Sequence, residues 1–492
     1  MNVIIIKTDQ QRFDTLSCMG NKTIRTPNID RLAERGTVFQ NAFCCSTLCV
    51  PSRVSFFTGQ YVHRTQCTSN APEHHISIGD WSFLEALKEN GYTLGLAGKN
   101  HAFHDSYLEK HFSYREEYGH WGKTHGNLTE GDKAVSQWLN SKEGPGNRMP
   151  NGMLMEGLVE TPLPFPKTEC PTWRIAQDAI RFIDQNRNRS FFLHCSFPDP
   201  HFPNTTCEPY YSMYLPGSVE LENPEIDWSG RPFAHFVQSQ SSGYDTYSKD
   251  ERKKILSSYY GQIHFIDDAI GSLVDAVEER GLLENTLFVF TSDHGDFAGR
   301  YGLIGKTKAF YEVLIRVPLI IVIPNESQVS RSDANISNID VMPTAGEVLG
   351  LKQPEEVQGQ SFLGVIRGDE STHRHAIFAE VGEPRTPPPP IPIEEFPAYS
   401  SRRREEDGVF WFVEYTTRGR SAMIRKDGWK YCYYTGDREE LYHIEDDPSE
   451  INNLASVEKH AEIKDKLKSE LLEWSLTEPQ KNNVHIDYLK QS

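Results

Sequence analysis

The feature that most constrains the fold is the alternation of short, uninterrupted apolar runs with amphipathic segments of helical length. Apolar runs occupy residues 3–6, 92–97, 191–196, 286–290 and 319–323, and helical patterns occupy 27–33, 81–90, 173–186 and 249–280. Apolar runs that lack a polar face are typical of strands buried on both sides. The alternation therefore predicts an α/β fold with a large, mainly parallel central sheet covered by helices on both faces.

The pattern changes near residue 372, which predicts a second, smaller unit. A chain of 492 residues is longer than one hydrophobic core usually supports. We expect an α/β domain over 1–371 and an α+β domain over 372–492, with a short antiparallel sheet (409–413, 421–425, 429–434) and a closing helix at 458–474. The second unit includes a proline-rich segment at 383–397, expected to be a loop or lid rather than a packed element, and a charged run at 400–407.

Charge and composition exclude several classes of function. The net charge of −18 argues against a nucleic-acid partner, and no apolar run approaches the ~20 residues of a membrane span. Residues 1–11 do not have the pattern of a signal peptide, which predicts a cytoplasmic protein, or a periplasmic or secreted one if a leader was removed. The nine cysteines show no disulfide framework, and all but Cys49 are expected to be small buried apolar residues. The sequence sets no oligomeric state.

The segment from Cys49 to Gly59 carries the strongest functional signal. It matches C-x-P-S-R-x-x-x-x-T-G at all six specified positions and resembles the modification signature of the type I, formylglycine-dependent sulfatases of the alkaline-phosphatase-like superfamily. The resemblance implies that a formylglycine-generating enzyme converts Cys49 to an aldehyde, whose hydrate attacks sulfur with one hydroxyl and expels sulfate with the other. The structural alternative is a buried cysteine that precedes a helix. Arg53, one helical turn later, lies on the same face and is expected to hold the hydrate oxygens.

Two further segments resemble the metal site of that family. Thr8 to Arg12 is similar to T-D-D-Q-R, with Gln10 at the second acidic position, and Ser292 to Gly295 is similar to the segment that completes the site. The resemblance implies one divalent metal ion held by Asp9, Gln10, Cys49, Asp293 and His294, with Asp293 accepting a proton from the nucleophile. Calcium is the usual ion of the family; manganese is the alternative, because it occurs in phosphatase-like relatives and a histidine ligand favours a softer ion.

Four basic residues complete the resemblance. Gly98-Lys99-Asn100-His101 is similar to G-K-W-H, so Lys99 is implied to bind sulfate and His101 to deprotonate the second hydroxyl. His201 is implied to bind sulfate and protonate the leaving alcohol, although a histidine in a proline-rich loop is also common. Lys306 is implied to contact sulfate, with Lys308 as its rival. These cations would concentrate positive charge in one cleft of an acidic protein.

The sequence thus predicts a hydrolase of sulfuric esters, with two alternatives. Gln10 and His294 also suit a phosphonate or phosphate ester hydrolase that uses the same formylglycine, and an unmodified protein that only binds sulfated glycans is the third hypothesis. Aryl, choline and glycan sulfates all remain candidate substrates. The long inserts at 103–152 and 383–407 are expected to border the substrate, where Trp121 and Tyr399 either stack on it or pack internally.

Overall fold

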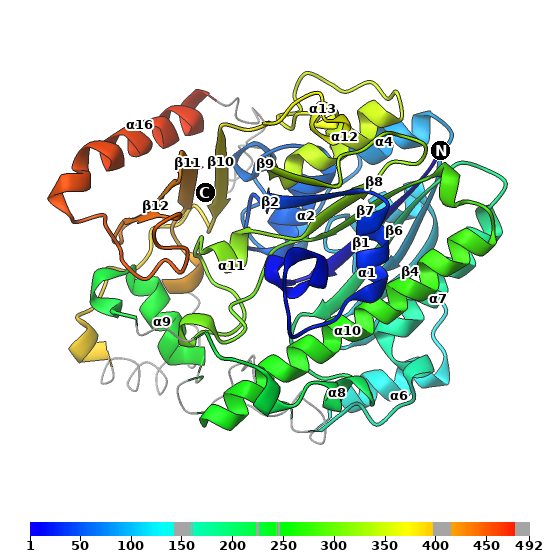
Figure 1. The fold of residues 1–492 in the computed structure, drawn as a ribbon, viewed down its shortest axis with the longest axis horizontal. Coiled ribbons are helices and arrows are strands. Elements are labelled where there is room, and N and C mark those ends of the chain that lie inside the picture. Colours follow the sequence, from blue (N-terminus) through cyan, green and yellow to red (C-terminus); the bar gives the residue numbers. More distant parts are fainter. Residues whose placement is uncertain are drawn as a thin grey trace, which may run out of the picture.

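A computed structural model describes residues 1–141, 159, 161–222, 226–242, 244, 247–396 and 415–477. Its largest element is a nine-stranded sheet in the order β5-β4-β3-β6-β1-β7-β8-β2-β9 (Figure 1). The strands are β1 (Asn2–Asp9), β2 (Thr37–Phe43), β3 (Thr93–Gly98), β4 (Phe112–Gly119), β5 (Gly122–His125), β6 (Phe191–Pro200), β7 (Thr286–Ser292), β8 (Leu319–Val322) and β9 (Arg331–Ser337).

The centre of this sheet is parallel. Strands β4, β3, β6, β1 and β7 run in one direction. Strand β8 is antiparallel to both of its neighbours, and β5 is antiparallel to β4 at the edge. The predicted α/β class with a mainly parallel sheet is confirmed.

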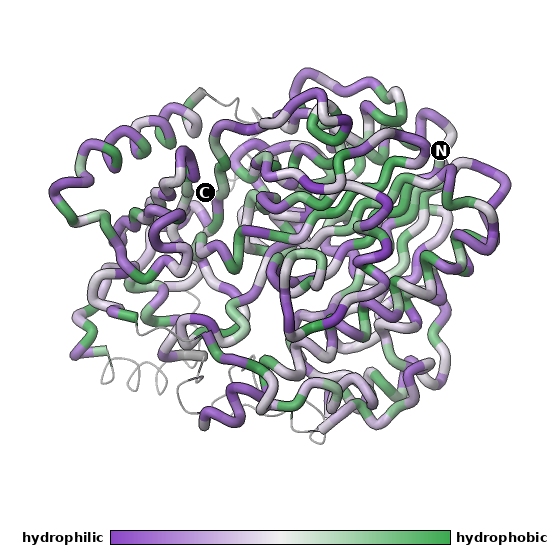
Figure 2. The backbone as a smooth tube through the Cα atoms, in the orientation of Figure 1, coloured by the Kyte–Doolittle hydropathy of each residue, from purple (hydrophilic) through white to green (hydrophobic). Residues whose placement is uncertain are grey.

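Helices cover both faces of the sheet, and β1 shows why. Its residues Ile4 and Ile6 belong to one hydrophobic cluster, whereas Val3 and Ile5 belong to another. This division follows from the alternation of side chains along a strand. The first cluster includes α1 (Pro27–Glu34), α7 (Pro171–Asn186) and α10 (Lys249–Glu279), and the second includes α2 (Cys49–Thr58), α4 (Phe83–Glu89) and α12 (Val341–Val348). Figure 2 shows the apolar strands between these helices.

A four-stranded antiparallel sheet lies towards the C-terminal end of the chain. Its order is β10 (Ala376–Val381), β11 (Ser421–Lys426), β12 (Trp429–Tyr434) and β13 (Glu440–His443), and α16 (Ala461–Thr477) packs against β11 and β12. The short sheet and closing helix are confirmed. The strand predicted at 409–413 and the charged run at 400–407 lie outside the described residues, and β10 and β13 were not predicted as strands.

The second sheet shares a core with the first. Ile377, Met423 and Cys432 belong to the same hydrophobic cluster as Val3 and Ile5 of β1. The division of the chain at residue 371 stays a prediction, but this shared cluster means that the two parts are not separated by solvent.

The proline-rich segment has irregular backbone but is not unpacked. Over its described part, to residue 396, regular structure is limited to a short 3₁₀ turn at Ile393–Glu395. Phe396 is 2% exposed and contacts Phe233 and Phe236 of α9 (Phe233–Ser242). The described part of the segment is therefore irregular, as expected of a loop, and Phe396 packs against α9 because prolines prevent regular structure without preventing apolar contacts.

The remaining helices are short. They are α3 (Val62–Thr65), α5 (Asp105–His111), α6 (Glu130–Leu139), α8 (Tyr210–Met213), α11 (Glu312–Ile315) and α13 (Leu363–Arg367). Within the described part of the chain, no helix has both the length and the apolar character needed to cross a bilayer. All nine cysteines are described, and none of them forms a disulfide.

Candidate active site

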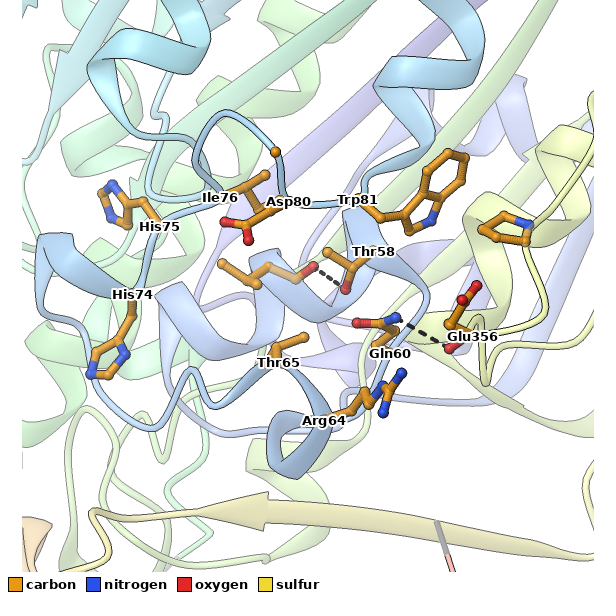
Figure 3. A pocket seen from close by; sticks show the side chains of 13 residues that line it. Thr58, Gln60, Arg64, Thr65, His74, His75, Ile76, Asp80, Trp81 and Glu356 are labelled. Atoms are coloured by element: carbon orange, nitrogen blue, oxygen red, sulfur yellow. Dashed lines mark hydrogen bonds between the residues drawn. The ribbon is translucent and has the colours of Figure 1, made fainter. Parts of the chain in front are cut away.

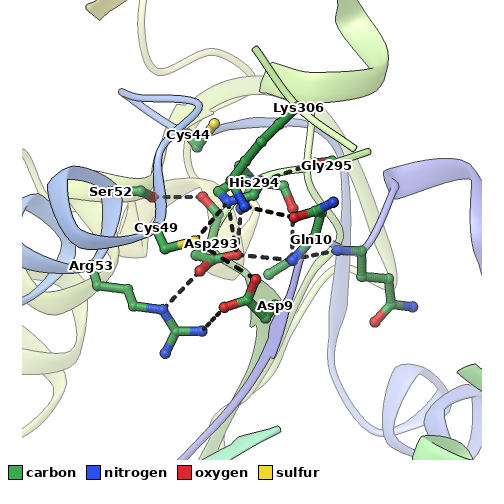
Figure 4. A network of polar contacts seen from close by, with 12 residues as sticks. Asp9, Gln10, Cys44, Cys49, Ser52, Arg53, Asp293, His294, Gly295 and Lys306 are labelled. Atoms are coloured by element: carbon green, nitrogen blue, oxygen red, sulfur yellow. Dashed lines mark hydrogen bonds and ion pairs between the residues drawn. The ribbon is translucent and has the colours of Figure 1, made fainter. Parts of the chain in front are cut away.

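The candidate residues meet at the carboxyl edge of the parallel strands, where open α/β sheets bind ligands. Asp9 ends β1, and Asp293 follows β7. Lys99 follows β3, and His201 follows β6. Cys49 is the first residue of α2, which begins beside this edge. Residues that are far apart in the sequence are therefore brought to one buried centre (Figure 4).

Four of the predicted metal ligands form a compact, fully buried cluster. One ligand atom from each of Asp9, Cys49, Asp293 and His294 lies within 4.8 Å of the others. Cys49 Sγ is 3.3 Å from His294 Nε2 and 3.8 Å from Asp9 Oδ1. The His294 Nδ1–H group donates to the carbonyl of Gly295 at 2.8 Å, so the lone pair on Nε2 faces the cluster. Two carboxylates and an imidazole with this tautomer fit a divalent cation.

Gln10 borders the cluster through both its backbone and its side chain. Its φ of 67° is left-handed, and its backbone N–H donates to Asp293 Oδ1 at 3.0 Å. Its amide nitrogen donates to Asp296, and its Oε1 atom accepts from Lys306 Nζ at 2.7 Å. The side-chain oxygen of Gln10 therefore accepts from a cationic lysine, and its neutral amide, unlike the carboxylates of Asp9 and Asp293, adds no charge to the site.

Arg53 is completely buried and connects the two carboxylates. Its Nε donates to Asp293 Oδ2 at 2.7 Å, its Nη2 donates to Asp9 Oδ2 at 3.1 Å, and its Nη1 donates to Ser196 Oγ at 2.8 Å. Through these bonds Arg53 offsets the charge of the two carboxylates and orients them, because a guanidinium is a planar, multi-donor cation. Its expected contact with the hydrate oxygens stays a prediction.

Lys99 forms a close ion pair with Asp9. Burial alone raises the pKa of Asp9, but the charges of Lys99, His201 and Arg53 hold that pKa well below its usual value. The turn that places Lys99 requires glycine at position 98, where φ is +111° and a Cβ atom would lie 1.8 Å from the carbonyl oxygen of Ser196.

Asn100 shapes the next turn. Its Nδ2 donates to the Phe103 carbonyl at 2.7 Å, and its Oδ1 accepts from the backbone of Ala102 and Phe103. This arrangement supports His101, which has a left-handed φ of 46°. Burial, followed by the charges of Lys99 and Arg53, lowers the pKa of His101, so its imidazole is neutral.

His201 lies beside His120, a histidine that was not predicted to belong to the site. Burial and the charge of Lys306 hold the pKa of His201 well below its usual value. Its Nδ1–H group donates to the Phe202 carbonyl at 2.7 Å, which leaves Nε2 as its reactive nitrogen. His120 stacks on His201 with ring centroids 3.8 Å apart. The only signal for His120 was its place in the insert at 103–152, because its neighbours are distant in sequence.

The structure separates the two candidate lysines. Lys306 reaches Gln10 at the edge of the cluster. Lys308 points away and donates to the Arg418 carbonyl, and burial lowers its pKa to about 8. The geometry therefore favours Lys306 over its rival for contact with an anionic substrate.

A cavity lies beside α2. It has a volume of about 430 Å³ and is lined by residues from α2 and from the segments 60–65, 74–81 and 354–356 (Figure 3). Among the described residues, neither insert predicted to border the substrate contributes to its lining. In the insert at 103–152, Trp121 contacts Phe202 at a centroid distance of 6.0 Å, which supports its packing alternative. Tyr399 lies outside the described residues.

A buried acidic cluster at the carboxyl edge of such a sheet, with a cysteine at the start of the adjoining helix, is the arrangement that the resemblance to hydrolases of the alkaline-phosphatase-like superfamily implied. A family model described as "Sulfatase" matches residues 1–351. The chain belongs to the sulfatase family.

Curated relatives and solved structures match almost the whole chain. The arylsulfatase of Clostridium perfringens is 27% identical, covering 96% of this chain and 93% of its own. The multifunctional alkaline phosphatase superfamily protein PehA of Trinickia caryophylli is 26% identical, covering 98% and 97%. The structure of a phosphonate monoester hydrolase from Silicibacter pomeroyi has a TM-score of 0.77 at 19% identity, covering 97% and 96%; this last likeness concerns the fold alone.

Proposed function

We propose that the chain hydrolyses sulfate monoesters, with position 49 converted to formylglycine and one divalent metal ion bound beside it. The observation that carries the proposal is the buried cluster in which ligand atoms of Asp9, Cys49, Asp293 and His294 lie within 4.8 Å of one another. A modified residue at position 49 would lie among acidic and imidazole ligands, with Lys99 and Lys306 nearby.

The chemistry is divided between the implied groups and the side chains of the chain. A divalent ion held by Asp9, Gln10, Asp293 and His294 would polarise a sulfate oxygen, and the hydrated aldehyde at position 49 would supply the nucleophilic oxygen and a second hydroxyl. We assign acceptance of the first proton to Asp9 rather than Asp293. Both oxygens of Asp293 already accept hydrogen bonds, from Arg53 and from backbone N–H groups, whereas Asp9 Oδ1 is 3.8 Å from Cys49 Sγ.

The basic residues act on the ester and on its leaving groups. Lys99 and Lys306 offset the charge of the sulfate oxygens. His201 donates a proton from Nε2 to the departing alcohol, since a bound anion raises the pKa of an imidazole that the neighbouring cations otherwise depress. His101 is the neutral base for the second hydroxyl. Arg53 acts earlier, by holding the two carboxylates in place.

Hydrolysis of phosphonate or phosphate esters by the same machinery is the second candidate. The observation that favours it is Gln10, whose uncharged amide replaces a carboxylate and is fixed between Asp296 and Lys306. The similarity to a phosphonate monoester hydrolase concerns the fold alone and does not decide between them. A non-catalytic protein that binds sulfated glycans is the third candidate, and the complete set of basic and acidic residues disfavours it.

The finer assignments follow from the same site. We propose calcium as the ion, with manganese as the rival, because oxygen ligands predominate and His294 is the only nitrogen ligand assigned. The substrate is a small-molecule or glycan sulfate, and the partner during maturation is a formylglycine-generating enzyme. The eight cysteines other than Cys49 are all unpaired, which fits a reducing compartment such as the cytoplasm.

The test begins with the protein produced together with a formylglycine-generating enzyme. Mass spectrometry of the peptide that contains Cys49 is expected to show the aldehyde. Turnover of an aryl sulfate is expected to exceed that of the matching aryl phosphonate, with calcium or manganese added to chelator-treated protein. The Cys49→Ala variant, purified in parallel, is the control for contaminating hydrolases.

Three outcomes separate the candidates. An active protein with an unmodified thiol would overturn the formylglycine assignment. Preference for the phosphonate would favour the second candidate. Binding of a sulfated glycan without turnover, by fully modified protein, would favour the third.

A further inference from the structure

His120 occupies the turn between β4 and β5, at the edge of the central sheet. It does not directly follow a central parallel strand, whereas other basic and acidic residues of the site lie at the ends of β1, β3, β6 and β7. It nevertheless lies among three of them: it contacts Lys99 and His201, and its ring centroid is 6.2 Å from that of His101.

The contact with Lys99 is a hydrogen bond of defined direction. The Nζ atom of Lys99 is 2.9 Å from His120 Nε2 and also pairs with Asp9. An ammonium group can only donate, so Nε2 of His120 accepts. His120 and Asp9 therefore hold the Lys99 ammonium from two sides and limit the positions that it can adopt.

The contact with His201 is a stack of two rings. Their centroids are 3.8 Å apart and their planes are inclined by 24°. The other side of His201 is tied to the chain by the bond from Nδ1 to the Phe202 carbonyl. The stack therefore fixes the remaining freedom of the imidazole, its rotation about the side-chain bonds, and hence the direction of Nε2.

The surroundings leave the His120 ring little space to move away. The cavity that it borders, lined also by Gly119, Asp199 and Thr206, has a volume of about 20 Å³, room for about one water molecule. Burial, followed by the charges of His201 and Lys99, holds the pKa of His120 well below its usual value, so the ring is neutral. A neutral ring is compatible with both contacts, because it accepts from a cation and does not repel His201.

We propose that His120 is a positioning residue for the ester hydrolysis: its Nε2 atom orients the Lys99 ammonium, and its ring face orients Nε2 of His201 towards the leaving group. The inference rests on the proposed function, because it assigns Lys99 to the anion and His201 to the departing alcohol. It adds a residue that acts through both of them.

Two substitutions separate the two contacts. His120→Gln retains an acceptor near the position of Nε2 but removes the ring, whereas His120→Phe retains a ring against His201 but removes the acceptor. His125→Gln, at the exposed end of β5 in the same hairpin, is the matched control. The measurements are kcat and KM for aryl sulfates with good and poor leaving groups, and the inhibition constant of inorganic sulfate.

The two variants are expected to fail in different ways. His120→Gln should lose about tenfold or more in kcat on poor leaving groups and much less on activated ones, because only the former need a proton from His201. His120→Phe should raise KM by about tenfold for every ester and raise the inhibition constant of sulfate by about the same factor, because it removes one charge-assisted hydrogen bond to Lys99. His125→Gln should match the unsubstituted protein.

The inference is overturned if both variants behave as the control, or if both lose the same factor on every ester with sulfate inhibition unchanged. Urea unfolding of each variant shows whether a uniform loss reflects misfolding; if one variant does not fold, the other still tests its own contact. If the unsubstituted protein cleaves only phosphonates, the series uses aryl phosphonates and inorganic phosphate. If it cleaves neither, the proposed function fails, and calorimetric binding of sulfate to His120→Phe still tests the contact with Lys99.

Discussion

The Oε1 atom of Gln10 accepts a hydrogen bond of 2.7 Å from Lys306 Nζ. Because the amide nitrogen of Gln10 donates to Asp296 at the same time, the orientation of this side chain is determined by two residues that follow β7. Position 10 resembles one that is acidic in the sulfatase motif, but it carries an uncharged amide here. The two polar atoms of that amide are both used: the oxygen accepts from Lys306, and the nitrogen donates to buried Asp296.

A carboxylate at position 10 should strengthen cation binding only if Asp296 is relieved of the added charge. In Gln10→Asp alone, two buried carboxylates would face each other, and we expect a loss of roughly 2 kcal/mol in the free energy of unfolding. The double variant with Asp296→Asn should recover that stability and bind calcium about tenfold more tightly. Calorimetric titration of chelator-treated protein measures the affinity, with Asp296→Asn alone as the control. An unchanged affinity in the double variant would contradict the placement of residue 10 beside the ion.

Lys306 and Lys308 provide a matched pair for the anion-binding role. Lys306→Ala should lower kcat/KM by about 100-fold, since it removes a cation next to the cluster. Lys308→Ala removes a bond to the Arg418 carbonyl and should cost about 1 kcal/mol of stability with kcat/KM nearly unchanged. Steady-state kinetics and urea unfolding of both variants distinguish them; equal kinetic losses would mean that the two lysines are not separated as the structure indicates.

Much of the site could be predicted because it uses the ends of buried strands. Asp9 and Asp293 follow apolar runs, and parallel neighbours bring their carboxyl ends to one edge. The same argument places Lys99 and His201. This argument uses only the local pattern of each apolar run and the rule that buried apolar runs form a parallel sheet. The separation of 284 positions between Asp9 and Asp293 (293 − 9) therefore does not weaken it.

The rest depended on contacts that leave no local pattern. His120 lies on an edge hairpin, and nothing in its neighbouring residues indicates Lys99 or His201. Arg53 was predicted to face the site, but no local pattern indicates that it pairs with both Asp9 and Asp293. Strand β10 was not predicted. Its alternate residues Ile377, Ala379 and Val381 are buried in the core that the two sheets share, and the local sequence does not indicate that core.

Arg53 should contribute to stability as well as to the site. Its side chain and those of Asp9 and Asp293 are all 0% exposed, so Arg53→Met leaves two buried carboxylates without their shared cation. We expect a loss of about 3–5 kcal/mol in the free energy of unfolding, measured in urea on unmodified, metal-free protein. Arg35→Met removes an exposed ion pair with Glu284 and should cost less than about 1 kcal/mol. Similar values for the two variants would contradict the buried network.

Asp340, which lies outside the cluster of candidate metal ligands, provides a test of how stability changes with pH. Burial raises its pKa, but the paired Arg374 guanidinium more than offsets this and lowers the pKa to about 2. The folded-state pKa lies below the unfolded value near 3.8, so the stabilisation is present above pH 4 and is lost as the pH falls towards 2. The shift corresponds to roughly 2 kcal/mol.

The difference in unfolding free energy between the unsubstituted protein and Asp340→Asn should therefore be fully present at pH 5 and shrink as the pH falls from about 4 to 2. Urea unfolding across this range measures it. Asp184→Asn is the control, because Asp184 forms an ion pair with Arg280 but is 48% exposed and should show a gap below about 1 kcal/mol at every pH. If the Asp340 gap were the same at pH 5 and pH 2.5, the carboxylate would not be the group that Arg374 stabilises, and the connection that it makes between the start of α12 and the segment before β10 would depend on neutral contacts instead.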